Sequence, residues 1–576
     1  MIDVLRNRFH TKSTDQLALS LILWLSLSVV IFIPIGLMFF YSFVRQFPVI
    51  DEYSFTLIHY VELLEDISLL IDVTRNTLIY TIGTTIVALS LGIALALIVE
   101  KYFPDSNIQL LILLPYGIPS VASLTGWIVL LGDNGVLTNA IVDIFGLSEA
   151  PYTIYSLWGM IWVEGLHTAP VAYLLVLPAI KAIPAAMEEA SFLSGASRIH
   201  TLRTIVLPII WPSILSTMIF VSVRTMATVA TPSILGVPDR IYTFGSVIPL
   251  IFLSGTELSY SKALAFSVLL TMITGVLMLY YIRVTALEGQ YTTVTGTGRS
   301  ASTHFTTNRY RRSIYYGFIM VFVSIAGFLP FLAILWDSLY PNYQLSFTLS
   351  NFTLSYYLSV LMGDAEGVSN IVRVFSNTAI VGLVVPISAM VLGLLIAYAN
   401  QIVKLRTGGL LSFFAAVPLA IPGVVKGLGF LVAYIWTPLY ATIGILILAF
   451  HSHALPIAMR YASPALTRVG IENFEAAAVV GDRTFGSFKN IILPIVSKDF
   501  IAGVVHIYVS VIRNVPIAIL LYSTGSEVLA VELLLVTQAG YLKTASTLSV
   551  MITLLSLVPY MMLHYSRLNR SQPHEH

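Results

Sequence analysis

The chain has 576 residues, of which 57% are hydrophobic and only 10% are charged, against about 25% charged residues in a typical soluble protein. Its 30 basic and 29 acidic residues leave a net charge of +1, and it contains no cysteine. This composition excludes a water-soluble enzyme, a disordered chain and a nucleic-acid-binding protein, as well as disulfides, thiolate metal sites and a cysteine nucleophile. A mean hydropathy of +0.87 predicts a polytopic membrane protein.

Twelve stretches are apolar enough to cross a bilayer as helices, which takes roughly 20 mostly apolar residues. The first six lie near residues 17–43, 76–99, 108–131, 157–180, 205–235 and 263–282. The second six lie near residues 313–336, 377–403, 409–435, 439–459, 491–521 and 544–565. Barrel strands would instead alternate over about 10 residues, so the predicted fold class is an all-α polytopic membrane protein.

The basic residues indicate the orientation of these spans. If both termini are cytoplasmic, 20 of the 30 basic residues lie in cytoplasmic segments and 6 lie outside. Such an excess on the cytoplasmic side is what the positive-inside rule requires.

Landmarks recur in the same order in the two parts of the chain, which predicts an internal duplication. The landmark pairs are Asn76-Thr77 and Asn377-Thr378, Pro115 and Pro418, and His167 and His453. Six spans in each part preserve orientation, so the repeat is parallel rather than inverted. We therefore expect a first half at 1–282, a polar cytoplasmic linker at 283–312 and a second half at 313–576. The first half is longer between its third and fourth spans, at 132–156.

A cytoplasmic loop with fixed spacing lies between the fourth and fifth spans of each half. In the first half it contains Glu189-Ala190-Ser191, Gly195 and Leu207-Pro208, and in the second half Glu475-Ala476-Ala477, Gly481 and Leu493-Pro494. Alanine-rich segments favour helix, each glycine can end a helix at positive φ, and proline is tolerated at the start of the next helix. The loops are therefore predicted to be rigid helical hairpins through which a partner could move two spans.

The loop pattern E-A-A-x3-G-x9-I-x-L-P resembles the EAA loop of the permeases of binding-protein-dependent ABC importers. The second half matches at every position, and the first departs only at Ser191. The resemblance implies two tandem six-helix halves of the type I importer permease and coupling loops that dock onto ATP-binding subunits. It implies as partners two copies of that subunit, an extracytoplasmic solute-binding protein and the lipid bilayer of a prokaryotic cytoplasmic membrane. Outer segments, including 132–156 and 236–261, would receive the solute-binding protein.

Two further stretches resemble one branch of this family. Linker residues 291–298 look like the junction of fused permeases of the ferric-iron type, and residues 231–238 look like a segment of ferric-iron, thiamine and polyamine permeases. Ferric iron is therefore the first expectation for the substrate. Thiamine, polyamines, phosphonate-like compounds and sugars stay open.

No G-x-x-x-x-G-K-[ST] phosphate-binding loop occurs in the sequence. The chain is therefore not expected to be an enzyme or to hold a cofactor, and ATP with magnesium is expected on partner subunits. No His, Asp and Glu cluster has metal-ligand spacing, so no resident metal is expected either.

Polar residues inside the spans are candidates for a translocation path, since they are costly there. The candidates are Arg224, Arg513, His167, His453 and Lys426. Each also has a structural interpretation. The arginines could pair with carbonyls or acids, the histidines could link helices by hydrogen bonds, and the lysine could extend its ammonium group to the interface. Two arginines facing one cavity would favour an anionic or anion-accompanied substrate.

Two other classes of protein compete with this interpretation. An ion-coupled secondary transporter with two six-helix halves is the alternative, although the G-x-x-x-D-R-x-G-R-[RK] loop of the major facilitator type is missing from its expected place. An intramembrane enzyme lacks paired aspartates or a Ser/His pair at catalytic spacing.

Overall fold

The computed structural model describes residues 13–44, 54–104, 107–255, 257–292, 309–341, 351–368, 370–468 and 493–568. These residues form helices and turns, and the part of the chain they cover contains no strand, only an isolated bridge between Val44 and Phe55. The predicted all-α fold class is confirmed.

The helices of the first half, as named here for residues 13–292, follow one another in a fixed order. They are α2 (Ser13–Leu27), η1 (Ser28–Phe32), α3 (Ile33–Tyr41), α4 (Ile58–Glu65), α5 (Ile67–Tyr102), α6 (Ile108–Gly117), α7 (Ser120–Leu131), α8 (Val136–Phe145), α9 (Leu157–Lys181), α10 (Ala185–Leu193), α11 (Arg198–Thr201), η2 (Leu202–Val206), α12 (Leu207–Met226), η3 (Pro232–Gly236), η4 (Val237–Asp239), α13 (Phe244–Leu253) and α14 (Glu257–Thr292).

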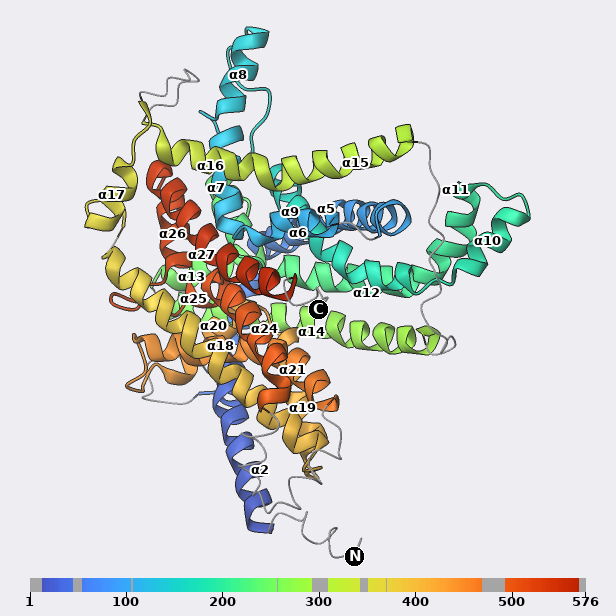
Figure 1. The fold of residues 1–576 in the computed structure, drawn as a ribbon. Helices are drawn as coiled ribbons and strands as arrows, with labels where there is room; N and C mark the ends of the chain where they lie inside the picture. The colour runs from blue at the N-terminus through green and yellow to red at the C-terminus, as the bar shows by residue number, and fades with distance from the viewer. Residues whose placement is uncertain are drawn as a thin grey trace, which may run out of the picture.

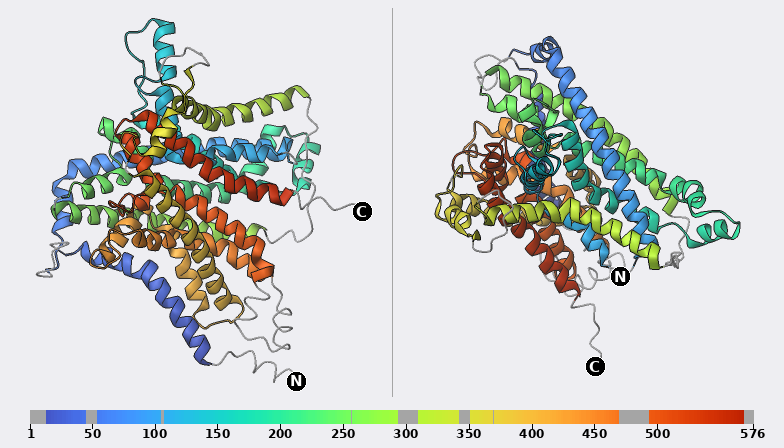
Figure 2. Two further views of the ribbon diagram at one scale, coloured as in Figure 1. Left: turned by 60° about the vertical axis from the view of Figure 1, so that its left-hand side comes forward. Right: turned by 90° about the horizontal axis from the view of Figure 1, so that it is seen from above.

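The second half, residues 309–568, repeats this order. Its helices are α15 (Arg309–Val323), η5 (Ser324–Phe328), α16 (Leu329–Leu339), α17 (Ser355–Met362), α18 (Ile371–Gln401), α19 (Gly408–Ala416), η7 (Val417–Ala420), α20 (Gly423–Tyr434), α21 (Ile443–Thr467), α24 (Leu493–Ile512), α25 (Val515–Ala518), α26 (Leu529–Gln538) and α27 (Leu542–Leu568). By order, α5, α9, α12 and α14 correspond to α18, α21, α24 and α27. Figures 1 and 2 show one helical assembly from which α8 and the pair α10–α11 project.

Eleven helices among the described residues are long and apolar enough to cross a membrane, and two bent helix pairs pass the same test. One bent pair, Gly408–Ala420 with Gly423–Tyr434, turns by 111° within the predicted span 409–435. The break falls before Pro422, where Ile421 is extended, and α6 and α7 are separated in the same way by Ile118 before Pro119. Proline disfavours the helical conformation in the residue before it, which accounts for the position of both breaks.

The predicted extent of the span at 205–235 is wrong. Helix α12 ends at Met226, and the chain then folds into a second bent pair, Pro232–Asp239 with Phe244–Leu253, at an angle of 77°. Most of α13 is buried, whereas residues 238–240 and 253–255 on either side of its buried part are exposed. The apolar run continues past Met226 because the following segment is buried in the protein, and hydropathy alone does not separate the two environments.

The two Asn-Thr landmarks make equivalent hydrogen bonds in the two halves. Thr77 accepts the N–H of Phe244 (3.1 Å) at the start of α13, and Thr378 accepts the N–H of Leu529 (2.9 Å) at the start of α26. The neighbouring side chains, Asn76 and Asn377, donate to carbonyls just before the same two helices. Each pair therefore satisfies backbone groups of a short buried helix that would otherwise lack partners.

The first span of each half, Gln16–Tyr41 or Arg309–Leu339, packs against the other half. Helix α3 contacts α20, and α16 contacts α7. At these crossings a Cβ added to Gly126 would lie 2.3 Å from the Pro330 carbonyl oxygen, and one added to Gly429 would lie 3.0 Å from the Pro34 oxygen. Both prolines follow a π-helical turn, η1 or η5, in which the backbone is locally widened. The crossings lock the two halves to each other.

Candidate functional site

A helical hairpin, α10 followed by α11, projects from the helical assembly at the first predicted coupling loop (Figure 1). Helix α10 starts after Pro184, and beyond its end Gly195 takes a φ of +82°. The Ala196 N–H donates to the Ser191 carbonyl (3.1 Å), which closes the turn as a Schellman motif does. The helix–glycine–helix geometry expected of this loop is thus present.

The hairpin exposes large apolar side chains. Leu193 is 89% exposed, Ile199 65% and Met187 49%. The motif residues Glu189 and Ala190 are exposed as well. Clustered exposed apolar side chains bordered by polar residues are typical of a protein docking surface.

The base of the hairpin is fixed by an ion pair that the sequence did not reveal. Glu188 of α10 accepts a hydrogen bond from Lys101 at the end of α5, and both side chains are buried. Adjacent residues on a helix point about 100° apart, so Glu188 faces the protein while Glu189 faces outward. The adjacent glutamates were the available signal, but sequence alone does not say which of them faces inward.

Ser191 is the residue at which the first half departs from the E-A-A pattern. Its hydroxyl lies 2.8 Å from the hydroxyl of Thr201 in α11. The bond links the two short helices, so the departure adds a contact across the hairpin.

The hairpin continues without interruption into the membrane. Residues Arg198–Met226 form one helical span through α11, the π-helix η2 and α12, so the helix begins earlier than the predicted span start near 205. Leu207 and Pro208 open α12 directly after η2, where the wider π-turn accommodates the missing proline N–H. A displacement of the hairpin is therefore transmitted along a single helix.

Much of the second coupling loop lies outside the described residues. This applies to Glu475, Ala476, Ala477 and Gly481. Leu493 and Pro494 open α24, as Leu207 and Pro208 open α12. The coupling role of both loops stays a prediction.

Three of the five candidate path residues gather around Tyr116, at the end of α6. The guanidinium carbon of Arg224 lies 5.3 Å from the centroid of the Tyr116 ring, and that of Arg513 lies 4.6 Å from it. Arg513 also donates to the Tyr116 carbonyl oxygen (2.7 Å), and the ring of His167 lies 5.9 Å from the tyrosine ring. Residues from α6, α9, α12 and the end of α24 thus form a polar centre that joins the two halves. The second half has Leu419 at the position of Tyr116, and this difference was the missed signal.

The other two candidates make separate contacts. The Nε2 atom of His453 lies 2.8 Å from the Ser510 hydroxyl, which joins α21 to α24. Lys426 is buried in α20 and lines a small cavity together with Ser452. Neither side chain is in ring or hydrogen-bond contact with Tyr116.

Glu164, which has no evident partner in the sequence, is held by two hydroxyl groups. Thr231 donates to one carboxylate oxygen (2.6 Å) and Thr168 to the other (3.3 Å). The carboxylate is buried in α9 and ties that helix to the residue just before η3.

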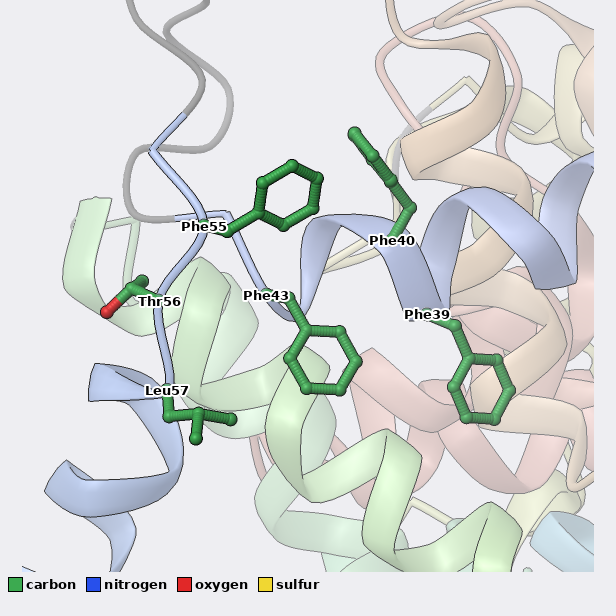
Figure 3. A pocket seen from close by; sticks show the side chains of 6 residues that line it. All are labelled: Phe39, Phe40, Phe43, Phe55, Thr56 and Leu57. Atoms are coloured by element: carbon green, nitrogen blue, oxygen red, sulfur yellow. The ribbon is translucent and has the colours of Figure 1, made fainter.

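A cavity of about 760 Å³ lies at the end of α3 (Figure 3). It is lined by Phe39, Phe40, Phe43, Phe55, Thr56 and Leu57. These side chains carry no charge and include none of the candidate site residues. Within the described residues, no group of three or more His, Asp or Glu side chains is arranged to hold a metal ion.

Comparison with known proteins identifies the type of transporter. Residues 88–287 match the family described as the binding-protein-dependent transport system inner membrane component. The chain is 22% identical over 553 residues to the Fe(3+)-transport system permease protein FbpB 2 of Haemophilus influenzae, a match that covers 94% of this chain and 97% of that protein. It is 23% identical over 471 residues to the ferric transport system permease protein FbpB of Actinobacillus pleuropneumoniae, covering 80% and 66%. A shorter match, 26% over 133 residues, covers 22% of this chain and 45% of the trehalose/maltose transport system permease protein MalF of Thermococcus litoralis.

The segment matched by the family runs from α5 into α14 and contains the α10–α11 hairpin, His167 and Arg224. A match to a binding-protein-dependent transport system implies partners that bind ATP and partners that bind the solute. The chain is a permease component of binding-protein-dependent ABC transport, with the family match at residues 88–287 and similarity to ferric transport permeases over most of its length.

Proposed function

We propose that this permease imports a small solute, with ferric iron as the favoured substrate. We further propose that a cytoplasmic ATP-binding subunit binds the α10–α11 hairpin. The observation that carries the proposal is the hairpin itself. It projects from the helical assembly with Leu193 almost fully exposed, yet a buried ion pair fixes its base. An element that is exposed at its tip and rigid at its base is suited to transmit a push or pull.

Two connections carry motion from the hairpin. The pair of Glu188 and Lys101 links it to α5, a helix of 36 residues. The continuous span Arg198–Met226 links it to Arg224 in the polar centre. In this proposal, closure of the ATP-binding subunits draws the loops of the two halves together and rocks the halves about the boundary between them, which alternates access to the polar centre.

The proposed assembly contains two ATP-binding subunits, one under the hairpin and one under residues 475–494. A solute-binding protein docks on the extracytoplasmic side, and both termini are cytoplasmic. The positive-inside rule supports this orientation, because 20 of the 30 basic residues then lie on the cytoplasmic side. ATP and magnesium are bound by the partner subunits, and this chain holds no cofactor.

Ferric iron is supported as the substrate by the relatives that match most of the chain, since two of them are named as ferric transport permeases. The sugar-permease relative matches a much shorter segment. Ferric iron here is the cargo of the importer and not a resident metal.

The test is Leu193→Glu in the complete transporter, assembled with its ATP-binding and solute-binding subunits. A charge at a docked apolar position is expected to weaken association with the ATP-binding subunit by about 2 kcal/mol, a typical hot-spot value, and to abolish ATP-driven uptake of radioactive iron. Ile144→Glu is the matched control for association with the ATP-binding subunit alone, because Ile144 is 77% exposed on the separate projection α8. It should leave the ATP-binding subunit bound.

Two outcomes would contradict the proposal. Full association and uptake by the Leu193→Glu variant would remove the hairpin from the coupling. Uptake that persists without ATP and collapses when the proton gradient is dissipated would favour the ion-coupled secondary transporter instead.

A further inference from the structure

We propose that Arg224 and Arg513 form a binding site for a small oxyanion at the boundary between the two halves, with Tyr116 and His167 completing it. The ligand carries phosphate or carboxylate groups and passes either alone or as the anion that accompanies a metal ion. The inference rests on the proposed transport function and adds to it an anion-recognition step made by the permease itself.

The first support is the convergence of the two arginines. They belong to different halves, yet their guanidinium groups approach the same aromatic ring, at 5.3 Å and 4.6 Å. Arg513 donates one hydrogen bond to the Tyr116 carbonyl oxygen. A guanidinium group has five N–H donors in a planar fork, so both arginines keep donors for a ligand.

The second support is the balance of charge. Within the described part of the chain, neither arginine forms an ion pair, and both lie at membrane-spanning segments where an uncompensated charge is costly. The buried carboxylate of Glu164 is held instead by Thr231 and Thr168. An oxyanion bound by the remaining N–H donors of the two guanidinium groups would supply the missing negative charge and accept paired hydrogen bonds.

The third support comes from comparing the two halves. With the spacing of 286 that relates the coupling loops, His167 corresponds to His453 and Arg224 corresponds to Ser510. In the second half this pair closes a direct hydrogen bond of 2.8 Å between His453 and Ser510. In the first half the serine is replaced by an arginine, and the other ring nitrogen of the histidine, Nδ1 of His167, is buried without a hydrogen-bond partner among the described residues.

An unsatisfied buried nitrogen is unusual in a folded protein and calls for an explanation. His167 is only 5% exposed, and its ring faces Tyr116, the same ring that the arginines approach. An oxygen atom of a bound anion could accept a hydrogen bond from this imidazole. The second half has Leu419 in place of the tyrosine, and its histidine is already bonded to Ser510. It would therefore contribute only Arg513 to the anion site.

The experiment measures equilibrium binding of inorganic phosphate and of citrate, each with and without ferric iron, to the full permease chain in lipid nanodiscs. The wild-type chain should bind at least one of these probes saturably. Arg224→Gln and Arg513→Gln should each weaken that binding by at least tenfold. Arg75→Gln is the control, because Arg75 is exposed and pairs with Asp72 at 3.3 Å outside the polar centre, and it should leave binding unchanged.

The arms of the experiment separate the sources of the anion. Binding of phosphate or citrate alone identifies a free oxyanion, and binding of citrate only with ferric iron identifies an anion carried with the metal. Should the glutamine variants fail to fold, Arg224→Lys and Arg513→Lys keep the charge but lose the fork, and each should still weaken binding severalfold.

The inference is overturned if the wild-type chain binds none of the probes, or if the arginine variants bind as the wild type does. ATP-driven uptake that depends on the hairpin could survive either result, so failure of the anion site does not imply failure of the proposed function. Conversely, Leu193→Glu should abolish uptake while leaving anion binding intact.

Discussion

Lys101 and Glu188 are 87 residues apart in sequence, yet they form a buried ion pair that joins the end of α5 to α10. A second pair at the same end of α5, between Lys181 and Glu100, is longer at 4.0 Å, and its lysine is 43% exposed. The two pairs differ in burial and so differ in what they can contribute. The buried pair holds the hairpin against a long helix, whereas the second pair is longer and its lysine is screened by solvent, although Glu100 itself is buried.

Lys101→Met should uncouple ATP hydrolysis from uptake. The substitution leaves Glu188 buried without its cation, which costs about 3–5 kcal/mol in comparable cases and releases the base of the hairpin. The measurement is the number of iron ions taken up per ATP hydrolysed, together with proteolysis of the hairpin. Arg75→Met is the control and should change neither, because Arg75 pairs with Asp72 where both side chains are more than half exposed.

The double substitution Lys101→Met with Glu188→Met removes both charges. It should recover much of the lost protection from proteolysis, because no unpaired charge stays buried. Equal behaviour of the Lys101 and Arg75 variants would contradict the assignment of the buried pair as the anchor.

Gly195→Val should weaken stimulation of ATP hydrolysis by the loaded solute-binding protein. The φ of +82° at Gly195 costs a β-branched residue about 1–2 kcal/mol or more, although the space around it is open. The effect therefore arises from backbone conformation and not from a clash. Gly409→Val is the control, since Gly409 also has open space around it but no positive φ. A normal response of the Gly195 variant would show that the turn conformation is dispensable.

Most spans could be predicted because they depend on a local feature, namely apolar runs, and the spacing of Pro, Asn and Thr is what predicts the repeat. The structural role of the Asn-Thr landmarks could not be predicted in this way. Thr77 acts on the backbone of Phe244, which is 167 residues away, and nothing local to either residue indicates the contact. The same holds for the end of α12, because a buried segment inside the protein is as apolar as a helix in lipid.

The residues of the candidate site differ in the same way, because some are visible in the local sequence and others only in the folded chain. The hairpin at Gly195 follows from a local pattern, and the arginines follow from their rarity in apolar spans. Tyr116, which gathers them, gives no such signal in the sequence, because tyrosine is common at membrane boundaries and carries no charge. Convergence on a ring is a property of the folded chain and is not visible in spacing.

Gly126→Ala should destabilise the crossing between α7 and α16. A methyl group there would meet the Pro330 carbonyl oxygen at 2.3 Å, a contact that only a backbone shift can relieve, so about 1–3 kcal/mol of stability should be lost. Gly429→Ala meets Pro34 at 3.0 Å and should cost less. Thermal unfolding of the purified chain checks the order. Gly36→Ala is the control, because no atom lies within 4 Å of the added group, and a loss as large as that of Gly126→Ala would contradict the close-approach argument.

Ile144→Ser combined with Phe145→Ser should reduce stimulation by the solute-binding protein without releasing the ATP-binding subunit. These side chains are 77% and 71% exposed at the end of α8, which projects from the assembly within the segment 132–156 that lengthens the first half (Figure 1). An exposed apolar tip of this kind is suited to dock a partner on the extracytoplasmic side, and removing it should lower stimulated ATP hydrolysis about tenfold while basal hydrolysis is kept. Ile86→Ser, with a 60% exposed side chain in the middle of α5, faces the bilayer in this arrangement and should leave stimulation unchanged. Full stimulation of the α8 variant would assign the docking of the solute-binding protein to other outer segments, because an exposed patch that can be removed without consequence is not a binding surface.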